Sequence, residues 1–336
     1  MTKSAVLFGG GGFIGSYLAL ELLQTDTVQH VVLADLNFSK TEWPKQLLQA
    51  EQEGKVSTCV VDVRQTINSP DLPAMADLIV NLAAVHREPG HEEHEYFDTN
   101  LPGAKNVCDW ATRVNCKSII FTSSIAVYGA TESTNPVPKT ESSEPTPNTP
   151  YGISKLQAEK THQEWQSQEY DRKLLITRPG VIFGAGEHGN VTRMLKAILS
   201  NYFVFVGNQG TRKAGGYVKE LTHAIVWMYR GQTEPVLLFN FSMNPAPTVE
   251  DYTRAIKTVA KKSLPTLSIP YFLILAASYV IAFIKKGSSI NPVRVEKMLR
   301  SNFIVPQVLK DRGYQYKYSL EGAMRDWSIE NPADWK

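Results

Sequence analysis

This chain has few cysteines, and it has almost no excess of charge of either sign. The three cysteines, Cys59, Cys108 and Cys116, have neither metal-site spacing nor the number needed for a disulfide framework. Lysine and arginine total 35 against 33 aspartates and glutamates, with no long basic run, so nothing favours a nucleic-acid partner. An apolar run begins at residue 5, and no cleavable signal peptide precedes it. We therefore expect a cytoplasmic protein with reduced thiols, no metal and no nucleic acid.

Long uncharged stretches are also scarce, and one stands out. Leu267 to Ile284 is eighteen residues without a charge; Pro270 divides it, and Lys285-Lys286 follows. This length is at the lower limit for a membrane-spanning helix. Two other interpretations are a buried helix and an apolar helix on a bilayer surface, with the lysines at the headgroups. A peripheral membrane contact through 267–286, at the inner face of the cytoplasmic membrane, stays open beside a plain cytoplasmic location.

What is present is the pattern of an α/β protein. Apolar residues make up 43% and charged residues 20%, which suits a globular protein with a substantial core. Short apolar runs predict strands, with room for crossover helices between most of them. The strands are expected at Ala5 to Phe8, His30 to Ala34, Lys55 to Val61, Leu78 to Leu82, Ser118 to Thr122 and Leu174 to Thr177. The order predicts a Rossmann-type, doubly wound parallel sheet.

The domain organisation follows from the same pattern. We expect a nucleotide-binding domain over 1–180. Residues 181–336 are expected to form mainly a smaller, mixed α/β substrate lobe, with some segments returning to the sheet. Gly129 to Pro150, which is rich in proline, predicts an irregular surface excursion, and Tyr151 to Glu169 predicts a helix.

A glycine turn between the first strand and the first helix is the strongest signal. Gly9 suits the tight turn, Gly12 lets the backbone approach a pyrophosphate, and Gly15 lets the helix pack closely on the strand. Asp35 ends the second strand, twenty residues beyond Gly15, where a carboxylate receives the ribose hydroxyls of a dinucleotide. That carboxylate would repel a 2′-phosphate, so NAD is favoured over NADP.

Two further clusters predict redox chemistry on a hydroxyl group. Ser123-Ser124 follows a strand, and Tyr151 and Lys155 stand four residues apart on one face of a helix. A phenol has a pKa of about 10, which a neighbouring ammonium lowers. Tyr151 can then take the proton of a substrate hydroxyl whose carbon gives a hydride to NAD. Ser124 can hydrogen-bond the same oxygen, and Lys155 can also hold the nicotinamide ribose.

These motifs together resemble the extended short-chain dehydrogenase/reductase superfamily, in its sugar-nucleotide epimerase/dehydratase branch. The marks are Gly9 through Gly15, Asn81-Leu82-Ala83-Ala84, Thr122-Ser123-Ser124 leading to Val127-Tyr128-Gly129, Tyr151-Gly152-Ile153-Ser154-Lys155, and Arg178 through Gly184. The resemblance implies that Asn100 supports the site and that the cofactor is also contacted by Phe13, Ile14, Asp62, Val63, Leu82, Ala83, Ala84 and Pro179. It further implies the possibility of a homodimer.

A narrower resemblance is carried by Ala83 through Arg87, by Val181 through Val191, and by Ile269-Pro270-Tyr271 leading to Asn291 through Val295. These stretches resemble bacterial 4-epimerases of N-acetylglucosamine carried on UDP or on undecaprenyl diphosphate, which serve surface polysaccharide (O-antigen) biosynthesis. Ile125-Ala126 follows the serines where dehydratases use acidic residues, which argues against dehydration. Lys219-Glu220 also departs from the usual acidic pair.

We therefore expect C4 epimerisation through a transient 4-keto sugar. Tyr151 would deprotonate the 4-hydroxyl, and the ketone would turn over in the site before hydride returns to its other face. Candidate phosphate ligands are Asn190, Arg193 and Arg212. Candidate sugar contacts are His86, Arg87, Ser123 and Ser124. Two alternatives remain: a net NAD(P)-dependent oxidoreductase, such as a 4-keto-sugar reductase or a hydroxysteroid dehydrogenase-like enzyme, and a non-catalytic NAD-sensing protein.

Overall fold

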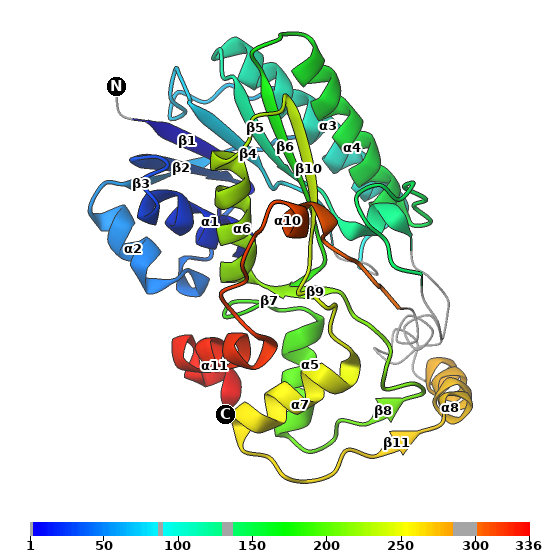
Figure 1. The fold of residues 1–336 in the computed structure, drawn as a ribbon. Helices are drawn as coiled ribbons and strands as arrows, with labels where there is room; N and C mark the ends of the chain where they lie inside the picture. The colour runs from blue at the N-terminus through cyan, green and yellow to red at the C-terminus, as the bar shows by residue number, and fades with distance from the viewer. Residues whose placement is uncertain (1–2, 87–89, 130–136, 285–300) are drawn as a thin grey trace.

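Seven parallel strands form the central sheet of this chain, in a computed structural model that describes residues 3–86, 90–129, 137–284 and 301–336 (Figure 1). The spatial order is β10-β6-β5-β4-β1-β2-β3. The strands are β1 (Ser4–Phe8), β2 (His30–Asp35), β3 (Val56–Val60), β4 (Leu78–Asn81), β5 (Ser118–Thr122), β6 (Lys173–Pro179) and β10 (Val236–Phe241). The predicted Rossmann-type fold is confirmed, and the six strands expected from the sequence are all present.

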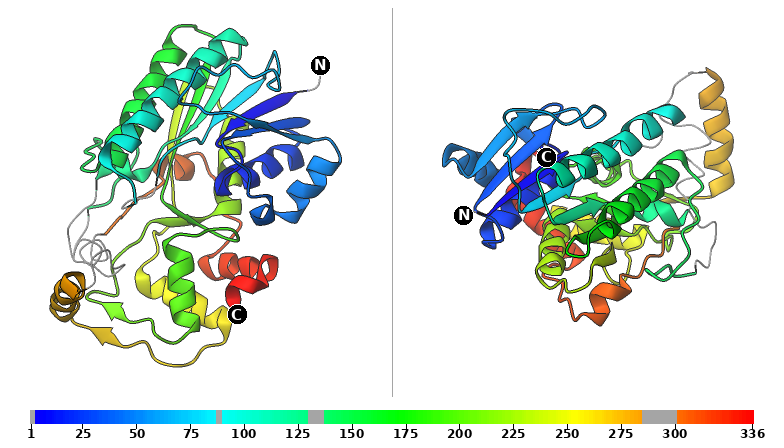
Figure 2. Two further views of the ribbon diagram at one scale, coloured as in Figure 1. Left: turned by 180° about the vertical axis from the view of Figure 1, so that it is seen from behind. Right: turned by 90° about the horizontal axis from the view of Figure 1, so that it is seen from above.

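Helices cover both faces of the sheet because its strands are apolar on both sides (Figures 1 and 2). α1 (Phe13–Gln24) and α6 (Val218–Arg230) pack on one face, and α2 (Lys45–Gln52) lies beside α1. α3 (Glu93–Arg113) and α4 (Pro150–Ser167) pack side by side on the other face. Neighbours along one strand alternate between the two cores: Leu7 belongs to the α1/α6 side and Val6 to the α3/α4 side.

The seventh strand comes from the second half of the chain. After β6 the chain leaves the sheet, returns as α6, and adds β10 alongside β6, with Leu174 opposite Val236. Residues beyond 180 therefore supply α6, β10 and the short helix α10 (Gln307–Asp311), which packs against β10, to the layers of the central sheet.

The remaining elements form a smaller lobe below the carboxyl ends of the strands (Figure 1). Its helices are α5 (Asn190–Leu199), α7 (Val249–Ala260) and α11 (Leu320–Glu330), and Trp327 of α11 is fully buried. Two small parallel pairs complete it: β7 (Val181–Phe183) with β9 (Gly215–Tyr217), and β8 (Phe205–Val206) with β11 (Ser268–Ile269).

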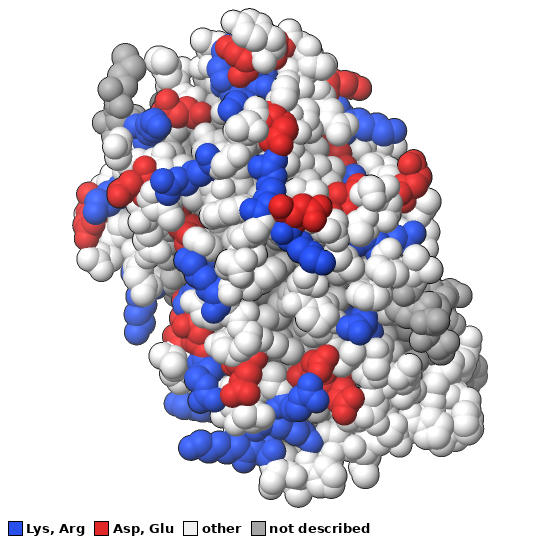
Figure 3. Space-filling model, viewed as in Figure 1, with Lys and Arg blue, Asp and Glu red and all other residues white. Residues whose placement is uncertain are grey.

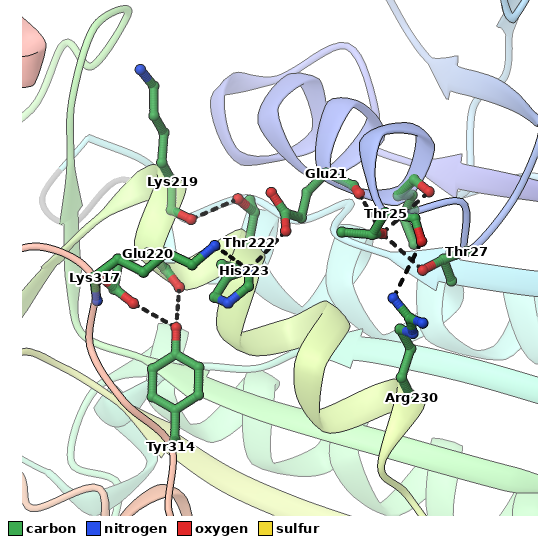
Figure 4. Close-up of polar contacts among 11 residues, drawn as sticks. Glu21, Thr25, Thr27, Lys219, Glu220, Thr222, His223, Arg230, Tyr314 and Lys317 are labelled. Carbon is green, nitrogen blue, oxygen red and sulfur yellow. Dashed lines mark hydrogen bonds and ion pairs between the residues drawn. The ribbon is translucent and has the colours of Figure 1, made fainter.

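Glu220 of α6 anchors the C-terminal part of the chain (Figure 4). This carboxylate is fully buried and accepts the backbone N–H groups of Lys317 at 2.9 Å and Tyr318 at 2.8 Å. It also accepts the hydroxyl of Tyr314, which follows the short helix α10 (Gln307–Asp311). Glu220, one of the two residues that depart from the usual acidic pair, thus holds the segment from Tyr314 to Tyr318 against α6.

The long uncharged segment of the sequence divides at Pro270. Ser268 and Ile269 pair with β8, and α8 (Tyr271–Ile284) begins directly after the proline. None of the helices in the described ranges has the length and apolar character needed to cross a membrane. Lys285 and Lys286 lie outside the described residues.

Candidate active site

The turn between β1 and α1 is built from glycines because other parts of the protein press against it. A Cβ atom on Gly9, which has a φ of +75°, would lie 2.6 Å from the backbone nitrogen of Ala83 at the end of β4. A Cβ on Gly15 would lie 2.6 Å from the carbonyl oxygen of Gly10. Side chains at these positions would push α1 away from the sheet.

Gly12 differs from these glycines. It is exposed, and a Cβ on it would meet only the carbonyl oxygen of Gly9, at 3.4 Å. Gly12 is the N-cap of α1, and no side chain caps the helix there. The protein's own packing therefore does not demand a glycine here, whereas a phosphate approaching the uncapped N–H groups of α1 does.

Phe13 and Ile14, the first residues of α1, are half-buried. The Phe13 ring lies close to the chain at Gly184 and Gly186, which follow β7. The glycine turn therefore meets the smaller lobe through this ring.

Asp35 stands at the end of β2, beside the glycine turn. Its carboxylate accepts the N–H of Gly11 at 3.0 Å and the N–H of Leu36 at 2.7 Å. Burial raises the pKa of Asp35, and these hydrogen bonds act in the opposite direction. An uncapped helix start, an open Gly12 and a carboxylate at the next strand end fit a dinucleotide such as NAD.

The ends of β3 and β4 border the same edge of the sheet. Asp62 follows β3 and is paired with Arg64, with Nη2 and Oδ2 2.7 Å apart; this hydrogen bonding lowers the pKa of Asp62. Val63 is buried, and its carbonyl oxygen accepts the side-chain amide of Asn106. After β4, Leu82, Ala83 and Ala84 are half-buried.

Asn100 of α3 connects this edge to α4. Its Oδ1 accepts the N–H of Val85 at 2.8 Å, and its Nδ2 donates to the Ser154 hydroxyl at 2.9 Å. Since Val85 follows the β4 residues and Ser154 precedes Lys155, one buried amide holds both segments. This geometry supports the role that the resemblance implies for Asn100.

Tyr151 and Lys155 lie in the first turns of α4, which Thr149 caps by accepting the N–H of Gly152. Tyr151 is half-buried, and its ring centroid is 6.1 Å from that of Tyr96. Lys155 is 2% exposed, and its Nζ lies 4.4 Å from the centroid of the Phe121 ring. Burial lowers the pKa of Lys155 to about 7, while the charge of Glu159 opposes this shift.

The two serines after β5 have different surroundings. Ser124 is half-buried, and its hydroxyl accepts the N–H of Ala126, capping the short helix η2 (Ile125–Tyr128). Ser123 is buried, and its hydroxyl donates to the carboxylate of Glu159. This arrangement favours Ser124 over Ser123 as a sugar contact and favours a structural role for Ser123.

Sequence reasoning missed a buried polar network beside Lys155. Glu159 pairs with Arg178, whose guanidinium also donates to the hydroxyl of Tyr128. That hydroxyl donates in turn to Asn240 Oδ1 on β10. A weak signal existed: Glu159 follows Lys155 by four residues on one helix, and Arg178 opens the Arg-Pro-Gly motif.

The candidate phosphate ligands fall in two places. Asn190 and Arg193 are exposed in the first turn of α5, where Arg193 Nη2 donates to Asn190 Oδ1 at 2.7 Å. Arg212 lies elsewhere: it donates to the carbonyl of Ala246 at 2.6 Å, and its guanidinium lies 4.7 Å from the centroid of the Phe303 ring.

Pro179 ends β6, and a Cβ on the following residue, Gly180, would lie 2.3 Å from the carbonyl oxygen of Ala214. The segment of Arg212 thus passes close to the end of β6. His86 is exposed after the β4 end, and Arg87 lies outside the described residues.

Neither metal nor thiol chemistry finds support in the described part of the chain. No group of three or more His, Cys, Asp and Glu residues in that part can hold a metal ion. All three cysteines are buried and free, and burial raises the pKa of Cys108 to about 12 and that of Cys116 to about 11. Such thiols are poor nucleophiles.

Comparisons with known proteins agree with this geometry. A profile of the NAD dependent epimerase/dehydratase family matches residues 5–236. The N-acetyl-alpha-D-glucosaminyl-diphospho-ditrans,octacis-undecaprenol 4-epimerase of Escherichia coli O157:H7 is 29% identical over 95% of this chain and 96% of its own. A bifunctional UDP-glucose and UDP-xylose 4-epimerase of Arabidopsis thaliana is 27% identical over 61% of this chain and 59% of its own.

Solved structures share the fold over nearly the whole chain. A UDP-N-acetylglucosamine 4-epimerase from Methanobrevibacter ruminantium M1, in complex with UDP-N-acetylmuramic acid, superimposes with a TM-score of 0.73 at 19% identity, covering 99% of both chains. A UDP-glucuronic acid 4-epimerase from Bacillus cereus, in complex with NAD, gives 0.74 at 16% identity, covering 99% of this chain and 100% of that one. The chain belongs to the NAD-dependent epimerase/dehydratase family, and NAD is its cofactor.

Proposed function

We propose that this protein is a sugar 4-epimerase that acts on N-acetylglucosamine linked through a diphosphate. The observation that carries the proposal is Tyr151 and Lys155 on one face of α4, a helix that packs against η2, which Ser124 caps, in a chain of this family. The relative from Escherichia coli, which covers almost the full length, supports the choice of sugar.

The chain's own residues would carry the proton chemistry. Tyr151 takes the proton from the sugar 4-hydroxyl and later returns it, while Lys155 stabilises the phenolate. The Ser124 hydroxyl donates to the same sugar oxygen as charge develops on it. Bound NAD would accept a hydride from C4 and give it back, so the overall reaction is redox-neutral.

Cofactor residues and phosphate ligands complete the proposal. The NAD phosphates would bind at Gly12 and the start of α1, and the adenosine ribose would bind at Asp35. Asn190, Arg193 and Arg212 are proposed for the diphosphate of the substrate. No carboxylate stands at Ile125 or Ala126 to support dehydration.

We further propose that the carrier of the sugar is a lipid and that the protein meets it at an anionic bilayer. Between Asp251 and Asp311 the sequence holds ten lysines and arginines and one acidic residue, Glu296, although the whole chain carries only +2. Near an anionic membrane each such cation contributes about 1 kcal/mol.

Large apolar side chains are exposed along the same part of the lobe. They are Leu264 at 58%, Leu267 at 69%, Phe272 at 67%, Leu273 at 51% and Tyr279 at 58%. In Figure 3 the surface over β11 and α8, at the lower right, shows neither blue nor red side chains, while blue side chains gather lower left, over α7. An apolar surface flanked by cations suits peripheral binding to an anionic bilayer.

One experiment tests the reaction and the carrier together. Purified protein is given UDP-N-acetylglucosamine and undecaprenyl-diphospho-N-acetylglucosamine separately, and the C4 configuration of each product is read by NMR. We expect conversion of the lipid-linked sugar without accumulation of NADH. Stoichiometric NADH would instead identify a net oxidoreductase, and conversion of the UDP-sugar alone would overturn the lipid carrier.

Membrane binding has its own test. We expect the protein to float with vesicles that contain phosphatidylglycerol and to float less with pure phosphatidylcholine. Replacing Phe272 and Leu273 by serine should abolish flotation, whereas Ile329→Ser, which alters an apolar residue 72% exposed on α11, should not. Equal flotation of these variants, or none by the unaltered protein, contradicts the proposal.

A further inference from the structure

Lys155 lies in surroundings that oppose its charge. Its side chain is almost fully buried, and its Nζ lies over the Phe121 ring. No hydrogen bond or ion pair links this Nζ to any of the described residues. A lysine that stabilises a phenolate has to be cationic, and burial works against the cation.

Glu159 supplies the nearest negative charge on the same helix. It follows Lys155 by one helical turn and is 2% exposed. Two hydrogen bonds from Arg178 hold its carboxylate, from Nε to Oε1 at 2.8 Å and from Nη2 to Oε2 at 2.7 Å. The hydroxyl of Ser123 donates to Oε1 as well. The carboxylate is therefore fixed in place from two neighbouring strands.

The same network reaches the segment that carries Ser124. Arg178 Nη1 donates to the hydroxyl of Tyr128 at 2.8 Å, and Tyr128 is the last residue of η2, which Ser124 caps. The Tyr128 hydroxyl then donates to Asn240 Oδ1 at 2.8 Å. α4, β6, η2 and β10 are thus joined by buried hydrogen bonds. Tyr151 and Lys155 lie on α4, and Ser124 is the N-cap of η2.

We propose that Glu159, clamped by Arg178, is a positioning residue that keeps Lys155 cationic and fixes α4 against the segment of Ser124. This inference rests on the proposed roles of Tyr151, Lys155 and Ser124. It adds a role for a residue pair that does not itself touch the reacting atoms.

None of the other titratable groups named around Lys155 supplies a negative charge that could take the place of the Glu159 carboxylate. On α4 they are Tyr151 and His162, and burial lowers the pKa of His162 to about 4, so this ring is neutral in the working range. β6 brings the cation Arg178, η2 brings Tyr128, and α3 brings Tyr96 against Tyr151. Glu159 is the one carboxylate among these groups.

The first test removes the negative charge and keeps the shape. In Glu159→Gln we expect the pKa of Lys155 to fall by at least one unit, read from the side-chain carbon and nitrogen resonances of lysine-labelled, NAD-loaded protein. The resonance is assigned by its absence in Lys155→Met. The high-pH limb of kcat should move down with it, while the KM for the sugar changes less than threefold. Glu164→Gln, at an exposed position on α4, should change neither the resonance nor the pH profile.

A second variant separates charge from packing. Glu159→Gln combined with Arg178→Gln leaves a neutral, hydrogen-bonding pair and no buried unpaired cation, so it is expected to fold if the single variant does not. Loss of the Arg178 charge alone raises the pKa of Lys155, so the double variant is compared with Arg178→Gln. Under the proposal, Lys155 in the double variant titrates below its value in Arg178→Gln. If the two variants titrate alike, Glu159 acts through packing alone and the proposal is overturned.

The Lys155 titration needs no turnover, so it distinguishes this inference from the proposed function. A protein that fails to epimerise any sugar but shows the expected shift in Glu159→Gln retains the charge role of Glu159 and loses the assigned reaction. An active epimerase whose Lys155 resonance does not change in Glu159→Gln keeps the assigned reaction and loses the charge role of Glu159.

Discussion

Asn100 on α3 and Ser154 on α4 are joined by a hydrogen bond of 2.9 Å, one residue before Lys155. The same amide also binds the backbone of Val85 through both of its polar atoms. One side chain thus fixes the distance between the segment proposed to line the cofactor and the helix proposed to move the proton.

Replacing this amide by an isosteric apolar group should separate the two segments. In Asn100→Leu the backbone groups of Val85 lose their partner, so the free energy of unfolding should fall by roughly 1–3 kcal/mol. Because the two segments are then no longer held at a fixed distance, we also expect kcat to fall about tenfold. Asn106→Leu on the same helix is the control, because Asn106 binds the carbonyl of Val63 instead. An Asn100 variant with unchanged kcat would contradict this role.

Removal of the phenolic hydroxyl should stop turnover without disturbing the fold. We expect Tyr151→Phe to lower kcat by about 10³-fold, within the range for loss of a positioned acid or base. NAD content after extraction and the unfolding temperature should stay as in the unaltered protein. Tyr170→Phe, at a side chain 97% exposed, serves as the matched control. Retained turnover in Tyr151→Phe would end the proposed mechanism.

Two glycines in the same turn should respond differently to alanine. At Gly12 the added methyl group meets only one protein oxygen at 3.4 Å, so Gly12→Ala should fold normally and lose most of its bound NAD. At Gly9 the methyl group meets the backbone of Ala83 at 2.6 Å with φ at +75°, so Gly9→Ala should lower the free energy of unfolding by roughly 1–3 kcal/mol or more. NAD content and chemical denaturation measure the two effects, and equal behaviour of the two variants would contradict the assignment.

Acid should destabilise the protein through His162. Its Nδ1 donates to the carbonyl of Ala158 at 2.7 Å and its Nε2 accepts from Asn81, an arrangement that requires a neutral ring. Burial lowers the pKa of His162 to about 4, below that of the unfolded chain, so the unfolded state binds more protons between these two values.

The free energy of unfolding should therefore fall as the pH drops from about 6.5 to about 4, by roughly 2–3 kcal/mol from this residue. His162→Phe should flatten this part of the stability curve, and His188→Gln, at an exposed ring, should leave it unchanged. Chemical denaturation at a series of pH values measures the slope. Equal slopes in the His162 variant and the unaltered protein would contradict the assignment.

The hydrogen bonds that Glu220 accepts should contribute to the stability of the fold and should not affect kcat. Glu220→Gln leaves one acceptor oxygen where two now receive the N–H groups of Lys317 and Tyr318 and the hydroxyl of Tyr314, and it removes the charge that strengthens these bonds. We expect a loss of about 2 kcal/mol in the free energy of unfolding. The segment after residue 312 should become accessible to protease at the same time. Glu321→Gln, at a half-exposed carboxylate on α11, is the control.

The sequence predicted the strands of the first half well because each is a buried apolar run bounded by turn residues. Leu78 to Asn81, for instance, is buried throughout, so its run of apolar residues carries its own signal. β10 was not located individually, because its partner β6 lies about sixty residues earlier and no local pattern indicates that pairing.

Within the candidate site, the sequence predicted which residues share a face of one helix, but it did not predict contacts between different elements. Tyr151 and Lys155 share a helix face, which four-residue spacing reveals. Ser123 and Ser124 are neighbours after one strand, where successive side chains point to opposite sides, and the sequence does not say which one is buried in the network of Glu159. The partners of Glu159 come from β6 and from the end of β5, so only the folded chain brings them together.

β10 follows its partner β6 by about sixty residues in the sequence, and this separation has a consequence for folding during synthesis. While the ribosome adds the residues between Leu174 and its partner Val236, the outer edge of β6 has no neighbour. At 5–20 residues per second this interval lasts roughly 3–12 s. A nascent chain with an open, apolar parallel edge is a target for misassembly with other chains, so α6 and β10 have to dock promptly for the newborn protein to escape aggregation.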